Sequence, residues 1–337
     1  MRPGGSSAWG LLVVLASAAI ACSPGGGHVT TVAGQTAPPY ITPTPCTMPR
    51  RGPGAAMWCS VPLAPGVVWR YSYRPLPDVP LVNVVEVDPE RVVVRAVESV
   101  RAPRGYERVD EMARRTGALV AINGGFFDNT GTPPPFRFQS MLRLHGATIA
   151  HNLVPRPAVG LRGPPAHPVG FGIDPPPSPG GASLNGFKDA VGAGPFVVVP
   201  NPKPSAGIPS WTASPGGFDW SCSAHPRSAV WVLKDGRIVL GAFDGYDDAS
   251  GFWLDAPGSS YCGNVAPTGW NGESLGAFIL EQYPDTVRAM NLDGGGSTTF
   301  VVRGIVRNEQ HNGPLPRSVI DGIVVFAGPA AASAVSP

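Results

Sequence analysis

Residues 287–298 read VRAMNLDGGGST, and this stretch decides how the rest of the chain is interpreted. Its first six residues predict a short strand that ends at Leu292 and leads directly into Asp293. Gly294, Gly295 and Gly296 follow, and such a run lets backbone N–H groups face an anion. A triple glycine on its own is more often a tight turn with an aspartate that caps it. The stretch therefore predicts a strand that delivers a carboxylate to a turn.

A second turn of this kind lies upstream. Residues 118–122 (ALVAI) are continuously apolar and predict a short strand that is buried on both faces. The strand leads into NGGFFD, residues 123–128. Its glycines let the backbone approach a ligand, and its aromatic faces suit a sugar ring. Two polar turns that each follow a buried strand are harder to explain as structure alone, so both are candidates for function.

The remaining periodic stretches are rich in β-branched residues. Hairpins are predicted over residues 81–97, with a turn at Pro89-Glu90, and over residues 227–243, with a turn at Asp235-Gly236 and Asp244 at the end. Helices are predicted at 106–116 and 274–282, and further strands at 298–302 and 318–326. This order predicts an α+β (mixed α/β) fold: a single domain with a mixed, largely antiparallel β-sheet core and flanking helices.

Composition excludes some classes of function. The 337 residues carry 25 Lys and Arg against 23 Asp and Glu, a formal net charge of +2, and only 14% of residues are charged. Nucleic-acid binding depends on clustered Lys and Arg, so no nucleic-acid partner is expected. Gly and Pro together make up about a quarter of the chain, which is enriched over ordinary usage.

The N-terminus predicts export. Arg2 and the apolar run at 11–21 are typical of a signal peptide, and Ala19-Ile20-Ala21-Cys22 is similar to a bacterial lipobox. We therefore expect either a cell-envelope lipoprotein, whose only membrane contact is a lipid on Cys22, or ordinary secretion. The predicted divisions are a signal peptide at 1–21, a Pro/Gly/Thr-rich tether at 22–66, a folded domain at 67–327 with a Pro-rich insertion at 154–186, and a tail at 328–337.

The five cysteines fit an oxidising compartment. If Cys22 carries lipid, an even set of four is left: Cys46, Cys59, Cys222 and Cys262. Four cysteines allow three pairings, and proximity favours Cys46 with Cys59 and Cys222 with Cys262. No C-x-x-C and no H-E-x-x-H motif occurs, so we expect neither a metal nor another cofactor.

Taken together, the motifs resemble the phosphodiester glycosidase family, in the family's order, across roughly residues 84–326. The segments that carry the resemblance are NGGFFD at 123–128, GAGPFVV at 192–198, HPRSA at 225–229, Asp235-Gly236, FDG at 243–245, NLDGGGST at 291–298 and RSV at 317–319. The chain departs from the family at Ser228, where Thr is usual, at Ala193, where Gly is frequent, and at Tyr246, where Arg is frequent. These departures bear on which sugar and which acceptor are recognised.

The resemblance implies hydrolysis of a sugar joined through its anomeric carbon to a phosphodiester, either a phosphoglycan or a smaller sugar-1-phosphodiester. Such a reaction needs a carboxylate near the anomeric carbon and cations for the phosphate. The candidate catalytic residues are Asp293, Asp244 and Arg227. The candidate substrate-binding residues are Asn123, Gly124, Gly125, Asp128, Gly294, Gly295, Gly296, Ser297, Thr298 and Arg317, although Arg317 could instead pair with Asp321.

Two other interpretations stay open. The same cleft could bind envelope polysaccharide without turnover. Gly272-Glu273-Ser274-Leu275-Gly276 also fits the G-x-S-x-G pattern of serine esterases, with Asp293 and His311 following in the expected order. That pattern needs a strand directly before the serine, whereas residues 263–271 do not predict a strand, so Ser274 is better explained as part of a helix N-terminus.

Overall fold

The computed structural model describes residues 57–73, 82–101, 105–128, 138–153, 155–165, 167–174, 184–199, 225–244, 270, 272–308 and 315–328. The chain divides into a unit at 1–40 and a unit at 41–337, and all described residues belong to the second. The predicted signal peptide, Cys22, Cys46, Cys222 and Cys262 lie outside the described residues. Within the described ranges, no helix is long and apolar enough to cross a membrane.

A seven-stranded sheet forms the largest layer. Its order is β1 (Met57–Ala64), β2 (Val67–Tyr73), β3 (Val82–Val87), β14 (Ile238–Phe243), β13 (Arg227–Leu233), β15 (Thr286–Asn291) and β12 (Phe196–Val198). Every pair in it is antiparallel. The predicted hairpin over 227–243 is confirmed, because β13 pairs with β14 and Gly236 takes a positive φ of 85° in the turn.

Two five-stranded sheets and one small pair complete the β structure. One sheet has the order β10 (Val169–Asp174), β9 (Arg156–Leu161), β11 (Asp189–Gly192), β7 (Leu142–Leu144) and β8 (Ala147–Ala150). The other has the order β17 (Ile305–Val306), β16 (Phe300–Val302), β6 (Val120–Asn123), β19 (Asp321–Phe326) and β4 (Val93–Glu98). β18 (Ser318–Val319) pairs with β5 (Glu107–Arg108).

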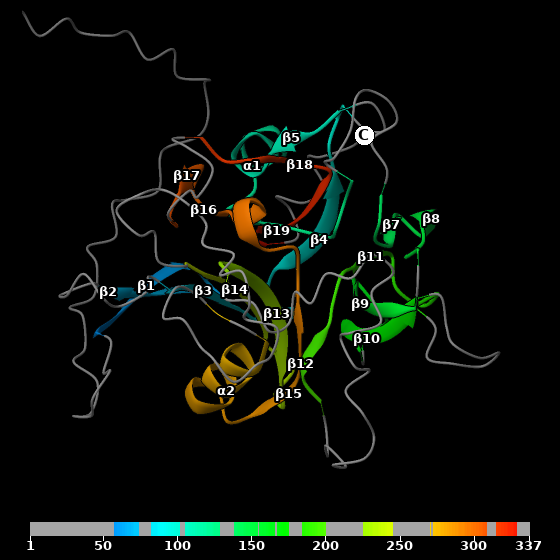
Figure 1. Cartoon of the computed structure of the whole chain (residues 1–337). Coiled ribbons are helices and arrows are strands. Elements are labelled where there is room, and N and C mark those ends of the chain that lie inside the picture. Colours follow the sequence, from blue (N-terminus) through cyan, green and yellow to red (C-terminus); the bar gives the residue numbers. More distant parts are fainter. Residues whose placement is uncertain are drawn as a thin grey trace, which may run out of the picture. The chain divides into compact units, whose positions relative to one another are not determined.

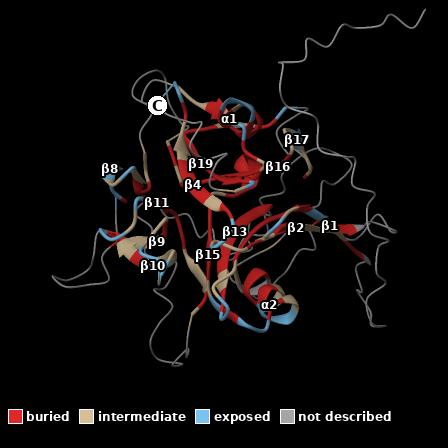
Figure 2. Ribbon diagram, turned by 180° about the vertical axis from the view of Figure 1, so that it is seen from behind, coloured by how far each residue is buried: buried red, intermediate tan, exposed pale blue. Residues whose placement is uncertain are grey.

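One apolar core joins the three larger sheets. Val85 and Leu240 from the seven-stranded sheet, Val159 from the β9 sheet, and Ile122 and Ile323 from the β6 sheet belong to the same buried cluster. Helices α1 (Val109–Thr116) and α2 (Gly272–Gln282) pack through smaller clusters, α1 against the β6 sheet and α2 against the seven-stranded sheet (Figure 1). Buried residues are concentrated where the sheets face one another (Figure 2).

The predicted hairpin over 81–97 is wrong. Its two strands exist as β3 and β4, but β3 pairs with β2 and β14, whereas β4 pairs with β19 in a different sheet. The turn after β3 is closed by bonds from the Arg91 and Val92 N–H groups to the carbonyl oxygen of Asp88. This turn carries the chain from one sheet to the other instead of folding it back, so that β3 is largely buried and β4 is half-buried.

Other expectations need smaller corrections. The Pro-rich passage at 154–186 is not irregular throughout, because β9 and β10 form an antiparallel pair inside it. The predicted tether at 22–66 extends too far, because β1 is an ordered strand with buried Trp58, Cys59, Val61 and Leu63. The described part of the chain is mainly antiparallel β structure with two α-helices, so it contains less helix and more separate sheets than the α+β prediction proposed.

Candidate active site

The two polar turns singled out in the sequence meet at one place. β6 ends at Asn123 and β15 ends just before Asp293, and these strands belong to different sheets. The side-chain Nδ2 of Asn123 donates to the carbonyl oxygen of Asp293 at 2.8 Å, and the Asp293 N–H donates to the carbonyl oxygen of Gly124 at 2.9 Å. These two bonds join the turns directly, so the candidate site lies on the seam between two sheets.

Asn123 is the central tie of this seam. It is fully buried, and its Oδ1 accepts hydrogen bonds from the Ser228 hydroxyl at 2.7 Å and from the Thr299 N–H at 3.1 Å. Together with the bond to Asp293, the Asn123 side chain therefore makes three hydrogen bonds, each to a residue at a different strand end. Asn123 therefore holds the Asp293 backbone in place and has a structural role whatever its contact with substrate.

The Gly124–Gly125 turn is glycine because the chain approaches it too closely for any side chain. A Cβ on Gly124 would lie 2.4 Å from Oδ1 of Asp321, and a Cβ on Gly125 would lie 2.4 Å from the carbonyl oxygen of Gly192. Since real Cβ atoms do not approach other atoms this closely, any larger residue would push the turn away from Asp321. The turn thus sets the position of two aspartates, Asp293 through the backbone and Asp321 through its side chain.

The environment of Asp293 raises the pKa of its carboxyl above the ordinary value. Burial raises its pKa to about 6, against lowering contributions from the Ser297 hydroxyl, the Gly294 N–H and the charges of Arg317 and Arg227. The Gly294 N–H donates to Asp293 Oδ1 at 2.9 Å. The Ser297 hydroxyl, by contrast, has no partner of ordinary hydrogen-bond geometry among the described residues. At neutral pH the carboxyl is therefore mostly ionised but is easily protonated, which suits a nucleophile or a general base.

Most N–H groups of the triple-glycine turn already donate hydrogen bonds to acceptors within the protein. It forms a 3-10 turn, η2 (Gly295–Ser297), with Gly295 at a φ of 59°. Gly295 donates to the carbonyl oxygen of Pro226, and Ser297 and Thr298 donate to carbonyl oxygens of the turn itself. Since Gly294 is already bonded to Asp293, the predicted cradle of phosphate-facing N–H groups does not form at these four positions. The hydroxyl of Thr298 is buried with no partner within the described ranges.

Two arginines act on Asp293. Arg227 begins β13, is almost fully buried, and donates through Nε to the carbonyl oxygen of Trp270 at 2.7 Å. Burial lowers its pKa to about 10, while the Asp293 charge raises it, so the guanidinium remains charged at pH 7. Arg317 also lowers the pKa of Asp293 by its charge. A carboxylate with two cations beside it matches what cleavage of a phosphodiester requires.

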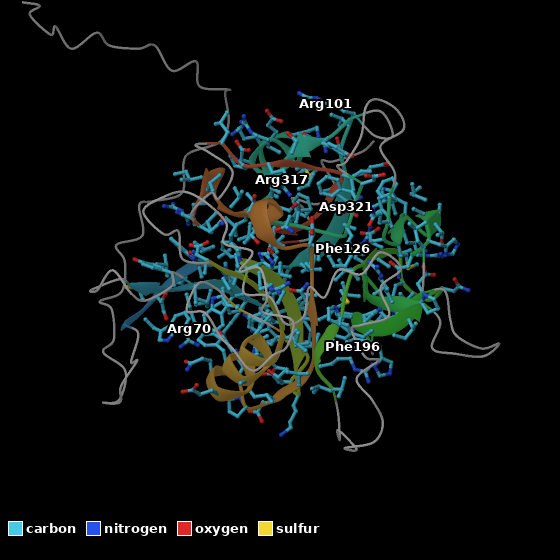
Figure 3. All side chains as sticks on the ribbon, viewed as in Figure 1. Arg70, Arg101, Phe126, Phe196, Arg317 and Asp321 are labelled. Atoms are coloured by element: carbon cyan, nitrogen blue, oxygen red, sulfur yellow. The ribbon has the colours of Figure 1, made fainter. Side chains whose placement is uncertain are left out.

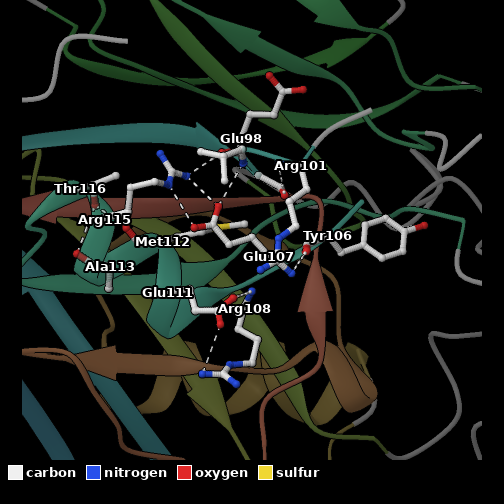
Figure 4. A network of polar contacts seen from close by, with 12 residues as sticks. Glu98, Arg101, Tyr106, Glu107, Arg108, Glu111, Met112, Ala113, Arg115 and Thr116 are labelled. Atoms are coloured by element: carbon white, nitrogen blue, oxygen red, sulfur yellow. Dashed lines mark hydrogen bonds and ion pairs between the residues drawn. The ribbon is translucent and has the colours of Figure 1, made fainter. Parts of the chain in front are cut away.

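Arg317 is positioned by a polar network around α1. It directly precedes β18, which pairs with β5, and Figure 3 shows where Arg317 and Asp321 lie on the ribbon. In β5, the buried Glu107 accepts from Arg115 Nε at 3.0 Å and from its terminal nitrogen at 2.9 Å (Figure 4). Arg115 also donates to the carbonyl oxygen of Glu98. Helix α1 thereby fixes β5, and β5 fixes the strand between Arg317 and Asp321.

Asp321 is a part of the site that sequence reasoning missed. It was considered only as a possible ion-pair partner of Arg317, yet no described ion pair joins the two. Oδ1 of Asp321 accepts from the Gly125 N–H at 2.7 Å. Burial, together with the charges of Asp293 and Glu98, raises the pKa of Asp321 to about 7, although the bond from the Gly125 N–H lowers it. Its place just after the RSV motif, at the start of an apolar strand, was the available signal.

The comparison with known families agrees with this arrangement. The sequence profile described as phosphodiester glycosidase matches residues 116–326, more than half of the chain, and this range contains Asn123, Arg227, Asp293, Arg317 and Asp321. The chain belongs to the phosphodiester glycosidase family. No curated protein matches it at a significant level.

Solved structures share the fold of this family member. A hypothetical protein from Synechocystis has a TM-score of 0.58 at 16% identity and covers 79% of this chain; the chain spans 63% of that protein. The catalytic domain of zebrafish N-acetylglucosamine-1-phosphodiester alpha-N-acetylglucosaminidase, auto-inhibited by its pro-peptide, has a TM-score of 0.52 at 20% identity, with 73% and 77% covered. A protein from Burkholderia pseudomallei has a TM-score of 0.54 at 17% identity, with 73% and 74% covered.

The other predicted carboxylates of this glycosidase-family chain lie differently. Asp244 is fully buried, and its Oδ1 accepts from Asn308 Nδ2 at 3.3 Å. Asn308 in turn donates to the carbonyl oxygen of Thr298. Asp244 therefore lies beneath the segment after the triple glycine. The backbone carbonyl of Asp128 accepts a hydrogen bond from the Tyr106 hydroxyl. Burial, and to a smaller extent the charge of Asp128, raises the pKa of Tyr106 to about 12.

The aromatic pair of the first turn is split between core and surface. Phe127 is buried with its ring centroid 4.7 Å from that of Tyr106. Phe126 is half-buried, and the Arg156 guanidinium carbon lies 5.2 Å from its ring centroid. One face of Phe126 is thus engaged by a cation.

Ser274 of the predicted esterase motif falls in α2, and no strand precedes it within the described residues 270 and 272–282.

Metal ligands do not gather in the described ranges. No group of three or more His, Cys, Asp or Glu side chains with metal-binding geometry occurs there. Cys59, the one cysteine of the predicted pairs inside those ranges, is buried in β1. Both disulfide pairings stay predictions.

Replacing Asn123 by alanine should destabilise the domain. Asn123→Ala leaves the buried Ser228 hydroxyl and Thr299 N–H without their acceptor, and each such loss costs about 1–3 kcal/mol. We expect the free energy of unfolding to fall by roughly 2–4 kcal/mol in urea denaturation. Glu281→Ala, at an exposed position of α2, is the control and should change it by less than about 0.5 kcal/mol. A loss below that control would contradict the role of Asn123 as the central tie.

Proposed function

We propose that this chain hydrolyses the bond between the anomeric carbon of a sugar and the oxygen of a phosphodiester, releasing free sugar and a phosphomonoester. The observation that carries the proposal is the half-buried Asp293, whose carboxyl has a pKa of about 6, beside the positive charges of Arg227 and Arg317. Family membership supports a hydrolase of this class. The zebrafish neighbour is named for such an activity, but its 20% identity to this chain supports only a shared fold.

The chemistry assigns one task to each charge. Cleavage of the bond from the anomeric carbon to oxygen develops positive charge on the sugar, which the ionised Asp293 stabilises, either as a nucleophile or as a base for the attacking water. The electron pair of that bond leaves with the phosphate oxygen. Arg227 and Arg317 neutralise the extra negative charge on the phosphate, so the leaving group needs little help from an acid. Water supplies the hydroxyl that ends on the sugar.

The remaining candidates take supporting roles. Asn123 holds the Asp293 backbone, and the Thr298 hydroxyl is a buried donor without a protein partner among the described residues, which suits a phosphate or sugar oxygen. Asp244 supports the same segment from beneath through Asn308.

We also propose export with a lipid on Cys22. Metabolic labelling with a fatty acid, lost in Cys22→Ala, would test that proposal.

The direct test is turnover on a panel of sugar-1-phosphodiesters that varies the sugar and the acceptor. Free sugar and phosphomonoester should appear in equal amounts, whereas neither a phosphate monoester nor a carboxylic ester of the same sugar should be hydrolysed. If no donor is turned over but envelope glycans bind, the chain is a binding module with the fold of the family. Hydrolysis of carboxylic esters that Ser274→Ala abolishes would instead identify a serine esterase.

A further inference from the structure

Asp321 has a carboxyl oxygen that the fold leaves without a partner. The side chain is 1% exposed, and while Oδ1 accepts from the Gly125 N–H, Oδ2 is buried and has no hydrogen-bond partner in the described part of the chain. A buried carboxylate normally has its charge balanced by a cation or by several donors. One backbone N–H is too little for a full negative charge.

The charges that face Asp321 make ionisation less favourable still. Asp293, at the end of β15, and Glu98, at the end of β4, are both acidic and both act on it. The nearby cations, Arg227 and Arg317, act on Asp293. Burial and these two carboxylates all favour the neutral acid.

The backbone of Asp321 belongs to the same tie. Its carbonyl oxygen accepts from the Gly124 N–H at 3.1 Å, while its side chain accepts from the Gly125 N–H. Gly124 passes the contact on, because its own carbonyl accepts from the Asp293 N–H. A Cβ on Gly124 would lie 2.4 Å from Oδ1 of Asp321, so the contact leaves no space for a side chain at this position. The position of Asp293 thus depends on Asp321 through a single glycine turn.

We propose that Asp321 serves the reaction as a neutral carboxylic acid: a positioning residue that holds the Gly124–Gly125 turn against Asp293 and keeps a second negative charge out of the site. The proposal rests on the proposed function. The proton resides on Oδ2, while Oδ1 remains the acceptor for Gly125. When Asp321 ionises, its charge opposes both the ionised Asp293 and the anionic phosphodiester, so activity falls.

This role predicts how activity depends on pH. Because burial raises the pKa of Asp321 to about 7, a rise in pH above 7 removes its proton, and kcat/KM of the parent should decline there. Asp321→Asn keeps the shape and an acceptor oxygen for Gly125 but cannot ionise. We expect Asp321→Asn to lose less than about threefold in kcat/KM at pH 5.5 and to exceed the parent at pH 8.5 by at least about tenfold. Asp321→Ala removes the acceptor and should lose more than about a hundredfold at both pH values.

The matched control is Asp285→Asn. Asp285 is an exposed carboxylate that pairs with Lys234 on the surface, so its pH profile should follow the parent. A decline above pH 7 that persists in Asp321→Asn, or loss of activity in Asp321→Asn at every pH while the fold is intact, would overturn the proposal. A merely structural role changes stability in both variants but leaves the decline in place.

Failure of the proposed function gives a different result. If the parent turns over no sugar-1-phosphodiester, the carboxyl carbon of Asp321 can still be titrated by ¹³C NMR in the parent, with assignment by its loss in Asp321→Asn. A midpoint above pH 6 supports the neutral acid, and a midpoint below pH 5 refutes it without reference to turnover. The titration also decides the matter if Asp321→Ala fails to fold.

Discussion

Asp293→Asn is expected to lower kcat/KM on a sugar-1-phosphodiester by at least about a hundredfold while leaving the fold intact. The amide keeps an oxygen that can accept from the Gly294 N–H, and the backbone bonds to Asn123 and Gly124 do not involve the side chain. What the variant loses is the negative charge that stabilises the sugar as its bond to phosphate breaks. Steady-state release of free sugar, with urea denaturation of the same samples, measures both quantities.

Two further variants set the scale for this loss. Ser274→Ala tests the esterase motif in α2 and should keep parental activity, as should Asp285→Asn on the surface. If Asp293→Asn retained more than a tenth of parental activity, Asp293 would not be the essential carboxylate, and Asp244 would become the first alternative. Loss in Ser274→Ala would count against the glycosidase mechanism as a whole.

Arg227→Gln is expected to have the second largest effect, a loss of about a hundredfold or more in kcat/KM. Its guanidinium is buried beside Asp293, where water cannot replace the lost charge, so the phosphate leaving group loses a cation in a region of low dielectric. The same change should alter the acid side of the pH profile. Arg227 lowers the pKa of Asp293, so its removal raises that pKa, and activity should disappear at a higher pH than in the parent.

Arg237→Gln provides the control on the same hairpin. Arg237 lies at the β13–β14 turn, is 43% exposed, and pairs with Asp235 and Glu86 at the surface. We expect its activity and acid limb to match the parent. Arg227→Gln with a large loss of activity but an unmoved acid limb would mean that Arg227 binds phosphate without acting on Asp293.

Local sequence patterns predicted the elements better than their partners. The hairpin over 227–243 was predictable because its Asp235-Gly236 pair suits the positive φ that Gly236 takes in the turn. The turn after β3 also separates two strands rich in β-branched residues, yet it leads to another sheet. The strands on either side of it pair with distant strands, β3 with β14 and β4 with β19, instead of with each other. Long-range pairing of this kind leaves no mark in a window of ten residues.

The site was predictable to the same extent. Asp293 and Asn123 stand at the ends of buried apolar runs, and polar groups at such positions are good candidates. Asp321 stands at the start of an apolar strand, which is a weaker signal, and its bond to Gly125, 196 positions earlier in the chain, could not be predicted from the sequence. The internal use of N–H groups in the triple-glycine turn was equally hidden, since the carbonyl of Pro226 that takes one of them comes from another strand end.

The seam between the two sheets has a consequence for the timing of activity. Asn123 and Asp321 belong to the β6 sheet, whereas Asp293 and Arg227 lie at strand ends of the seven-stranded sheet. The seven-stranded sheet alone supplies Asp293 and Arg227 but lacks Asn123 and Asp321, which hold Asp293 through its backbone, so a partly folded chain in which only one sheet has formed lacks the complete site. The protein therefore becomes active only when both sheets have formed and docked. Recovery of turnover during refolding should follow that last docking step and not the first appearance of β structure.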